Sequence, residues 1–76
     1  MALLFSVTPA SDGWAVRSES LARELFFKQG GRAEAQARAL AESAAQEGRS
    51  AEVRVFLRDG ALAGRFVHAP TQASAG

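Results

Sequence analysis

Short runs in which apolar and polar residues alternate predict β-strands in the first part of the chain. Residues 3–8 alternate in this way, and so do residues 14–18. Pro9, which has no N–H to donate, predicts the end of the first strand, and Asp12-Gly13 predicts a short loop. Together the two runs predict a β-hairpin.

The next stretch carries a mixed pattern. Leu21 and Leu25 have helical spacing, whereas Phe26 and Phe27 stand side by side just before a double glycine. The adjacent bulky residues favour a third strand over Glu24–Lys28, and a helical segment stays open as the alternative.

The clearest helical pattern covers about Arg32 to Glu47, a stretch rich in Ala, Glu, Gln and Arg, which are good helix formers. Gly31 is the expected N-cap and Gly48 the expected terminator. One face of this helix carries almost only alanine and one leucine; its residues are Ala33, Ala37, Leu40, Ala41 and Ala44. A helix this slim can lie close to its partner surface, which must then supply the bulk of the core.

The last regular pattern predicts a second hairpin. Apolar residues at positions 53, 55 and 57 alternate with Glu52, Arg54, Phe56 and Arg58. Asp59-Gly60 predicts a two-residue type I′ loop, with positive φ at both residues, and Leu62 to His68 forms the return strand.

The elements in order, β-β-β-α-β-β, predict an α+β fold in which one helix packs on one face of an antiparallel sheet. Residues 1–68 form a single α+β domain, and residues 69–76 are expected to be a flexible C-terminal tail. We expect Phe5, Trp14 and Phe27 to supply the bulk that the alanine helix lacks. Trp14 is expected to pack against the helix residues Ala37, Leu40, Ala41 and Ala44.

Composition narrows the function classes. The chain has 76 residues, a net charge of +1 and no Cys. Disulfides and thiolate metal sites are therefore excluded, and cysteine usage gives no redox compartment. The near-neutral charge does not call for a polyanionic partner. The start of the chain has neither the basic flank nor the length of a secretory signal, and no stretch approaches a membrane span, so we expect a cytoplasmic protein without membrane contact.

The stretch "VTPASDGWAVRSE" resembles the opening of a small bacterial family known as domain of unknown function 2188. The resemblance rests on Val7, Pro9, Val16 and Asp12-Gly13-Trp14, together with the alanine-rich helix and the closing Arg58-Asp59-Gly60. It covers roughly residues 3 to 68 and implies a fold of this kind. These are turn and core residues, so the resemblance implies no activity.

Candidate chemistry is sparse. His68 is the single histidine, and a metal site needs three or four converging ligands. Asp12 and Asp59 both precede Gly, where turn chemistry explains them. Gly30-Gly31 lacks the further glycines and the Lys of a phosphate loop. We therefore expect no catalytic residue, no cofactor, no metal and no enzyme activity.

The sheet face away from the helix is the best candidate surface. Alternation predicts that Arg17, Arg54, Phe56 and Arg58 lie together there, and Arg65 and Lys28 are uncertain additions. Leu4, Phe56 and either Phe66 or Val67 are expected to form an apolar patch on the same face. One hypothesis is a protein-interaction module, either a homodimer or a binder of another protein. The alternative is nucleic-acid binding, in which arginines neutralise phosphates and the Phe stacks on bases.

Overall fold

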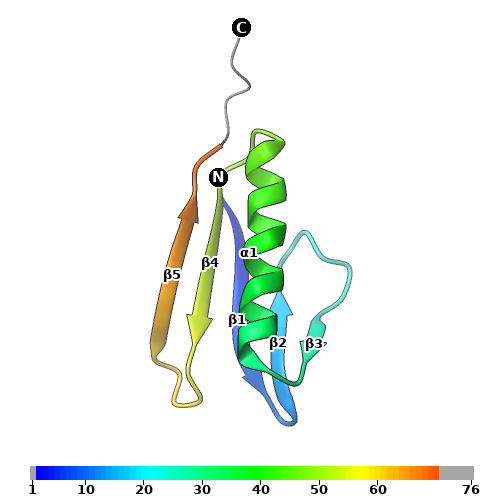
Figure 1. Ribbon diagram of the computed structural model, residues 1–76, viewed down its shortest axis with the longest axis vertical. Coiled ribbons are helices and arrows are strands. Elements are labelled where there is room, and N and C mark those ends of the chain that lie inside the picture. The colour runs from blue at the N-terminus through cyan, green and yellow to red at the C-terminus, as the bar shows by residue number, and fades with distance from the viewer. Residues whose placement is uncertain (1, 71–76) are drawn as a thin grey trace, which may run out of the picture.

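The computed structural model describes residues 2–70 and contains five strands and one helix, in the predicted order (Figure 1). The elements are β1 (Leu3–Ala10), β2 (Gly13–Arg17), β3 (Leu25–Phe27), α1 (Gly30–Gln46), β4 (Ala51–Phe56) and β5 (Leu62–His68). The ambiguous stretch before the helix is thus a strand, although shorter than predicted. Within the predicted tail, residues 69–70 have no regular structure and residues 71–76 lie outside the described part of the chain.

The five strands form one mixed sheet in the order β3-β2-β1-β4-β5. All neighbours are antiparallel except β1 and β4, which run parallel at the centre, so the prediction of a purely antiparallel sheet was wrong. The cause is the connection: α1 is 17 residues long, about 25 Å, and returns the chain to the end of the sheet where β1 starts. β4 must then run in the direction of β1.

The first hairpin is tighter than predicted. β1 continues through Pro9, which lies opposite Trp14, and Ala10 pairs with Gly13. Pro9 does not end the strand, because the pairing of β1 with β4 stops at Val7 and no β4 partner needs the missing N–H. Gly13 has φ +151°, and a Cβ there would lie 2.3 Å from the Phe27 carbonyl oxygen. Only glycine therefore fits where β2 passes β3.

The helix begins at Gly30, earlier than predicted, with Gln29 as an N-cap that makes no side-chain capping hydrogen bond. A Cβ on Gly30 would lie 2.9 Å from Cε2 of Trp14, so the indole packs directly on the first turn. The expected contact between Trp14 and Ala44, at the far end of the helix, was wrong. Ala44 lies about 21 Å farther along the axis than Gly30, beyond the reach of one side chain.

The helix ends at Gln46, close to the predicted Glu47, and Gly48, with φ +87°, terminates it as predicted. The Gly48 N–H donates to the Ala45 carbonyl at 3.0 Å, and the Arg49 N–H donates to the Ala44 carbonyl at 3.0 Å. These two bonds form a Schellman motif and satisfy carbonyls that the helix end would otherwise leave open.

The core joins alanines of α1 to apolar residues of the inner strands. The buried cluster consists of Phe5, Val7, Val16, Ala51 and Val53 from the strands and Ala33, Ala37, Ala41 and Ala44 from the helix. Leu40, Trp14 and Phe27 are partly buried and pack against it. In Figure 1 α1 runs in front of the sheet along β1 and β2. Because alanine is short, helix and sheet lie close together, and Phe5 and the valines fill the space between them.

The second hairpin has a wider loop than the predicted type I′ turn. The Gly60 N–H donates to the Leu57 carbonyl at 2.9 Å, and the Leu57 N–H donates to the Ala61 carbonyl at 2.8 Å. Only Gly60 has positive φ, at +89°, so the prediction for Asp59 was wrong. Asp59 instead accepts a hydrogen bond from the Ala61 N–H through Oδ1, at 2.9 Å. This is the pattern of a three-residue loop whose last residue is a left-handed glycine.

Candidate functional site

The sheet register places three arginines in one row across four strands. Ser6 of β1 lies opposite both Arg17 of β2 and Arg54 of β4, and Arg54 lies opposite Arg65 of β5. Directly opposed residues project from the same face of a sheet. We call this face, which lies opposite the one carrying Phe5, the open face. The predicted grouping of Arg17 with Arg54 thus corresponds to two neighbours on either side of Ser6.

Glu52 organises this row. It is buried, and it lies two residues before Arg54 on the same face of β4. Its carboxylate accepts a hydrogen bond from Nη2 of Arg65, at 3.1 Å, and another from Nε of Arg54. Nε of Arg65 also lies 3.0 Å from Oε2 of the same carboxylate, as an ion pair. One carboxylate therefore holds two guanidinium groups against the sheet.

These bonds shift the ionisation of the group. Hydrogen bonds from Arg65, and then from Arg54, lower the pKa of the Glu52 carboxyl from its usual 4.5 to about 2. The bond to the same carboxylate raises the pKa of Arg65. Both residues are therefore charged at every pH at which a cell operates, and the arrangement is permanent under those conditions.

The third arginine has its own acid. Nε of Arg17 lies 3.0 Å from Oε1 of Glu24, just before β3, and both side chains are well exposed. An exposed pair of this kind stabilises the fold very little, but it does occupy the guanidinium. Every arginine in the row therefore faces a carboxylate of the same chain. The row is polar, and two carboxylates neutralise two of its three positive charges.

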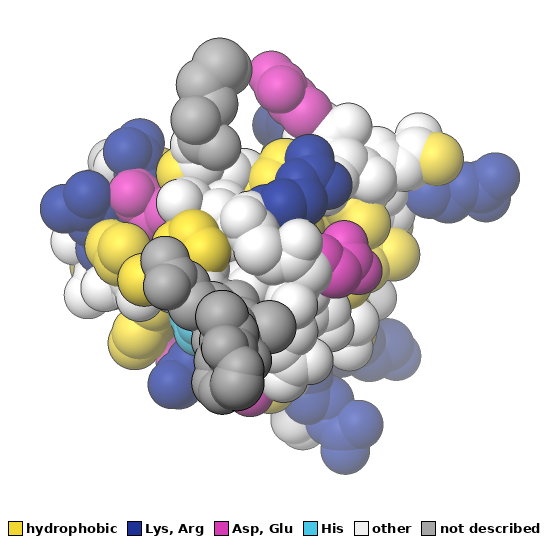
Figure 2. Space-filling model, turned by 90° about the horizontal axis from the view of Figure 1, so that it is seen from above, with side chains coloured by type: hydrophobic (Ala, Val, Ile, Leu, Met, Phe, Trp, Pro, Cys, Tyr) yellow, Lys and Arg dark blue, Asp and Glu magenta, His cyan; other side chains and the backbone are white. Residues whose placement is uncertain are grey.

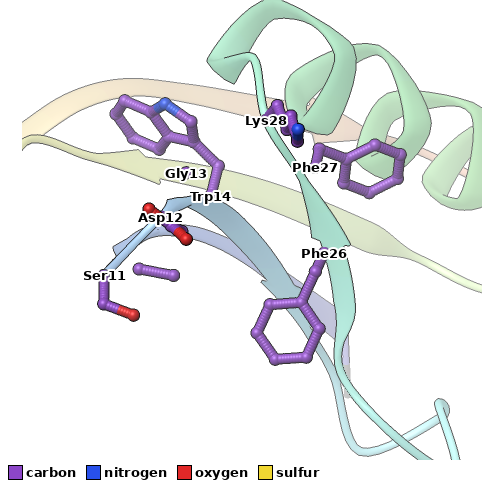
Figure 3. Close-up of a pocket in the computed structure, with 8 residues that line it drawn as sticks. Ser11, Asp12, Gly13, Trp14, Phe26, Phe27 and Lys28 are labelled. Carbon is purple, nitrogen blue, oxygen red and sulfur yellow. The ribbon is translucent and has the colours of Figure 1, made fainter.

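Exposed apolar side chains surround the row. Leu4 and Val67 lie opposite Glu52 on its two sides, and they are 38% and 66% exposed. Phe26 of β3, opposite Ala15 on the same face, is 69% exposed. Figure 3 shows Phe26 pointing away from α1, whereas Phe27 points toward it. The open face thus combines a central polar row with an apolar border.

Of the residues predicted to lie on the open face, Phe56 lies only at its margin and Arg58 lies elsewhere. Phe56 is half-buried and pairs with Leu62, next to a shift in the β4–β5 register. Arg58 does not join the row: its guanidinium lies over the Trp14 ring, 5.9 Å from the centroid. The alternation used to place Arg58 stops where β4 ends, at Phe56. For the same reason Leu57, expected to face the helix, is 47% exposed.

The two alternatives for the apolar patch, Phe66 and Val67, lie on opposite faces of the sheet. Phe66 belongs to the core side, where the Arg38 guanidinium lies 4.5 Å from its ring centroid, and Val67 is the member on the open face. Sequence reasoning missed Phe26 and Glu24, and it did not recognise the role of Glu52. The adjacent positions of Phe26 and Phe27, which place them on opposite faces of a strand, could have revealed Phe26. The arginine partners of Glu24 and Glu52 could be assigned only once the strand register was known.

A hollow of about 390 Å³ lies at the end of the sheet where the β1–β2 turn meets β3. Trp14, Phe26, Phe27 and Lys28 line it together with residues 10–13 (Figure 3). The polar side chains that line it are all exposed, so none is held in place for a ligand. Packing of Trp14 on the helix explains the aromatic lining, and the hollow supports no assignment.

No group of three or more His, Asp or Glu side chains within residues 2–70 is placed to hold a metal ion. His68 lies at the end of β5. No helix in the same range has both the length and the apolar character needed to cross a bilayer.

No family model, curated protein or solved structure matches this chain. The resemblance to domain of unknown function 2188 therefore stays a prediction, and the functional argument rests on the open face.

Proposed function

We propose that this chain is a non-enzymatic protein-interaction module that associates with further copies of itself through the open face and its border. The observation that carries the proposal is the double hydrogen-bonding role of Glu52, which binds both Arg54 and Arg65 among exposed apolar side chains. Surfaces of this composition suit protein contacts, because arginine stems offer apolar area while their charged ends stay hydrogen-bonded.

Nucleic-acid binding is the second candidate, because three arginines in one row beside an exposed Phe can neutralise phosphates and stack on a base. The carboxylates count against it. A phosphate would have to displace Glu52 from Arg54 and Arg65, and Glu24 from Arg17. On the end of the molecule seen in Figure 2, Lys and Arg side chains lie in several separate groups and do not form one basic patch.

The two functions respond differently to salt. Self-association through apolar and hydrogen-bonded contacts should change little between about 0.1 and 1 M NaCl, whereas affinity for single-stranded oligonucleotides should fall steeply through counterion release. The test is light scattering from about 20 µM to about 1 mM protein, concentrations that cover the weak contacts expected of a small interface. A mass that rises toward the dimer at both salt concentrations supports the proposal.

Matched lysine variants locate the contact. Val67→Lys places a charge on the open face, whereas Leu57→Lys places one on the β4–β5 loop, away from that face. We expect the first to remain monomeric and the second to behave as the parent does. A parent chain that is monomeric across the whole range, or that binds oligonucleotides tightly only at low salt, would overturn the proposal.

A further inference from the structure

The two edges of the sheet are unequal. β3 forms one edge with three residues, whereas β5 forms the other with seven. Within residues 2–70, β5 has β4 as its only strand neighbour. One side of the β5 backbone therefore carries a row of N–H and C=O groups without a strand partner in that part of the chain. Such a row is a template for another extended chain.

β5 has few of the features that usually protect an edge. It contains no proline, and its only Lys or Arg is Arg65, whose guanidinium is bound to Glu52 of the same chain. Leu62 and Val67 are exposed. A register shift leaves Ala63 without a β4 partner, but Gly64–His68 pair regularly. Five residues of regular, weakly charged edge therefore remain.

We propose that two copies of this chain pair antiparallel along β5, about a twofold axis, and so join their sheets into one of ten strands. The inference rests on the proposed function, because it takes a second copy of the chain as the partner, and it places the contact at the β5 border of the open face and not across that face. An identical β5 is the partner that matches best, because the same five residues offer the same alternation of donors and acceptors in antiparallel orientation. The two open faces then lie side by side as one continuous surface.

Charge opposes this pairing only weakly. The whole chain carries a net charge of only +1, and Glu52 neutralises one of the two arginines that it binds, so the cluster of Glu52, Arg54 and Arg65 contributes one positive charge per copy. Two copies therefore approach with little repulsion. Pairing over so short an edge buries less than about 1,200 Å² in total, which places the dimer among weak, reversible associations.

The experiment follows amide hydrogen exchange on the full chain at low and high concentration. In the monomer, every second N–H of Gly64–His68 points away from β4 and exchanges freely. We expect these alternate amides to exchange roughly tenfold more slowly once most of the protein is dimeric, while the amides of β3 do not change.

Two lysine variants separate edge pairing from face-to-face stacking. Val67 and Leu4 both lie opposite Glu52 on the open face, but Val67 is on the edge strand and Leu4 is on the central strand β1. Edge pairing predicts that Val67→Lys weakens the dimer about tenfold or more, whereas Leu4→Lys leaves it within about twofold of the parent.

The outcomes distinguish the two proposals. A dimer that resists Leu4→Lys and protects alternate β5 amides supports edge pairing. A dimer that Leu4→Lys also dissociates, with β5 amides unprotected, overturns edge pairing and leaves self-association through the open face in place. A protein that stays monomeric at about 1 mM removes both.

Discussion

Replacement of Trp14 by Ala measures how much the indole contributes from its position at the helix start. The indole packs on Gly30, where an added Cβ would lie 2.9 Å away, and the Arg58 guanidinium lies over the ring. It is partly buried, in contrast to Phe5, which is 2% exposed at the centre of the core. Full truncation of a buried aromatic costs about 3–5 kcal/mol, so we expect that cost for Phe5→Ala and about 2–3 kcal/mol for Trp14→Ala.

These losses are large for a domain of this size. A change of 1 kcal/mol shifts the Tm of such a domain by about 4–8 °C, so Trp14→Ala should lower the Tm by roughly 8–24 °C. Thermal melts of the parent, Trp14→Ala and Phe5→Ala, followed by far-UV circular dichroism, measure the differences. The reasoning fails if Trp14→Ala costs as much as Phe5→Ala, which would make the indole a central core residue, or if it costs nothing.

The remaining predictions concern two glycines and one carboxylate. Gly60→Val should destabilise the chain by more than about 1 kcal/mol in urea titration, because φ at this position is +89°; a neutral result would contradict the loop described above. Gly13→Ala should cost more, since its Cβ would meet the Phe27 carbonyl, and an unchanged urea midpoint would contradict that close approach. The pKa of Glu52 is lowered to about 2, so its stabilising effect should be complete above about pH 4.5 and be lost as the pH falls toward 2. Glu52→Gln should therefore flatten the fall in Tm over that window, and identical pH profiles for the parent and the variant would refute this expectation. If the carboxylate keeps phosphates away, the same variant should also gain salt-dependent affinity for single-stranded oligonucleotides, and unchanged oligonucleotide binding would refute that.

The local elements were readable from the residues that form them. Gly48 terminates the helix because glycine readily takes the left-handed conformation needed just beyond the helix end, and β5 spans Leu62–His68, as its alternation and the preceding Asp59-Gly60 indicated. The core face of α1 followed from the spacing of its alanines. Each of these features depends on neighbours within a few positions along the chain.

The predicted element boundaries were wrong by one or two residues where segments that are distant in the sequence meet in the fold. The helix begins at Gly30 because the Trp14 indole needs a residue without Cβ beneath it. Pro9 stays within β1 because no part of β4 pairs at its level. Propensity rules describe isolated segments, and here a packing partner from elsewhere in the chain decided the boundary.

The candidate site shows the same division between features set by local sequence and features set by the tertiary structure. Alternation alone brought Arg17 and Arg54 to one face, since side chains two apart in a strand share a side. Only the tertiary structure decided that Glu52 lies between Arg54 and Arg65, because strand register is a long-range property. The parallel pairing of β1 with β4 was likewise decided by where a helix of about 25 Å returns the chain. The sequence by itself therefore determined which elements form and which side chains each one presents, and the fold decided which charges meet and which edge of the sheet stays open.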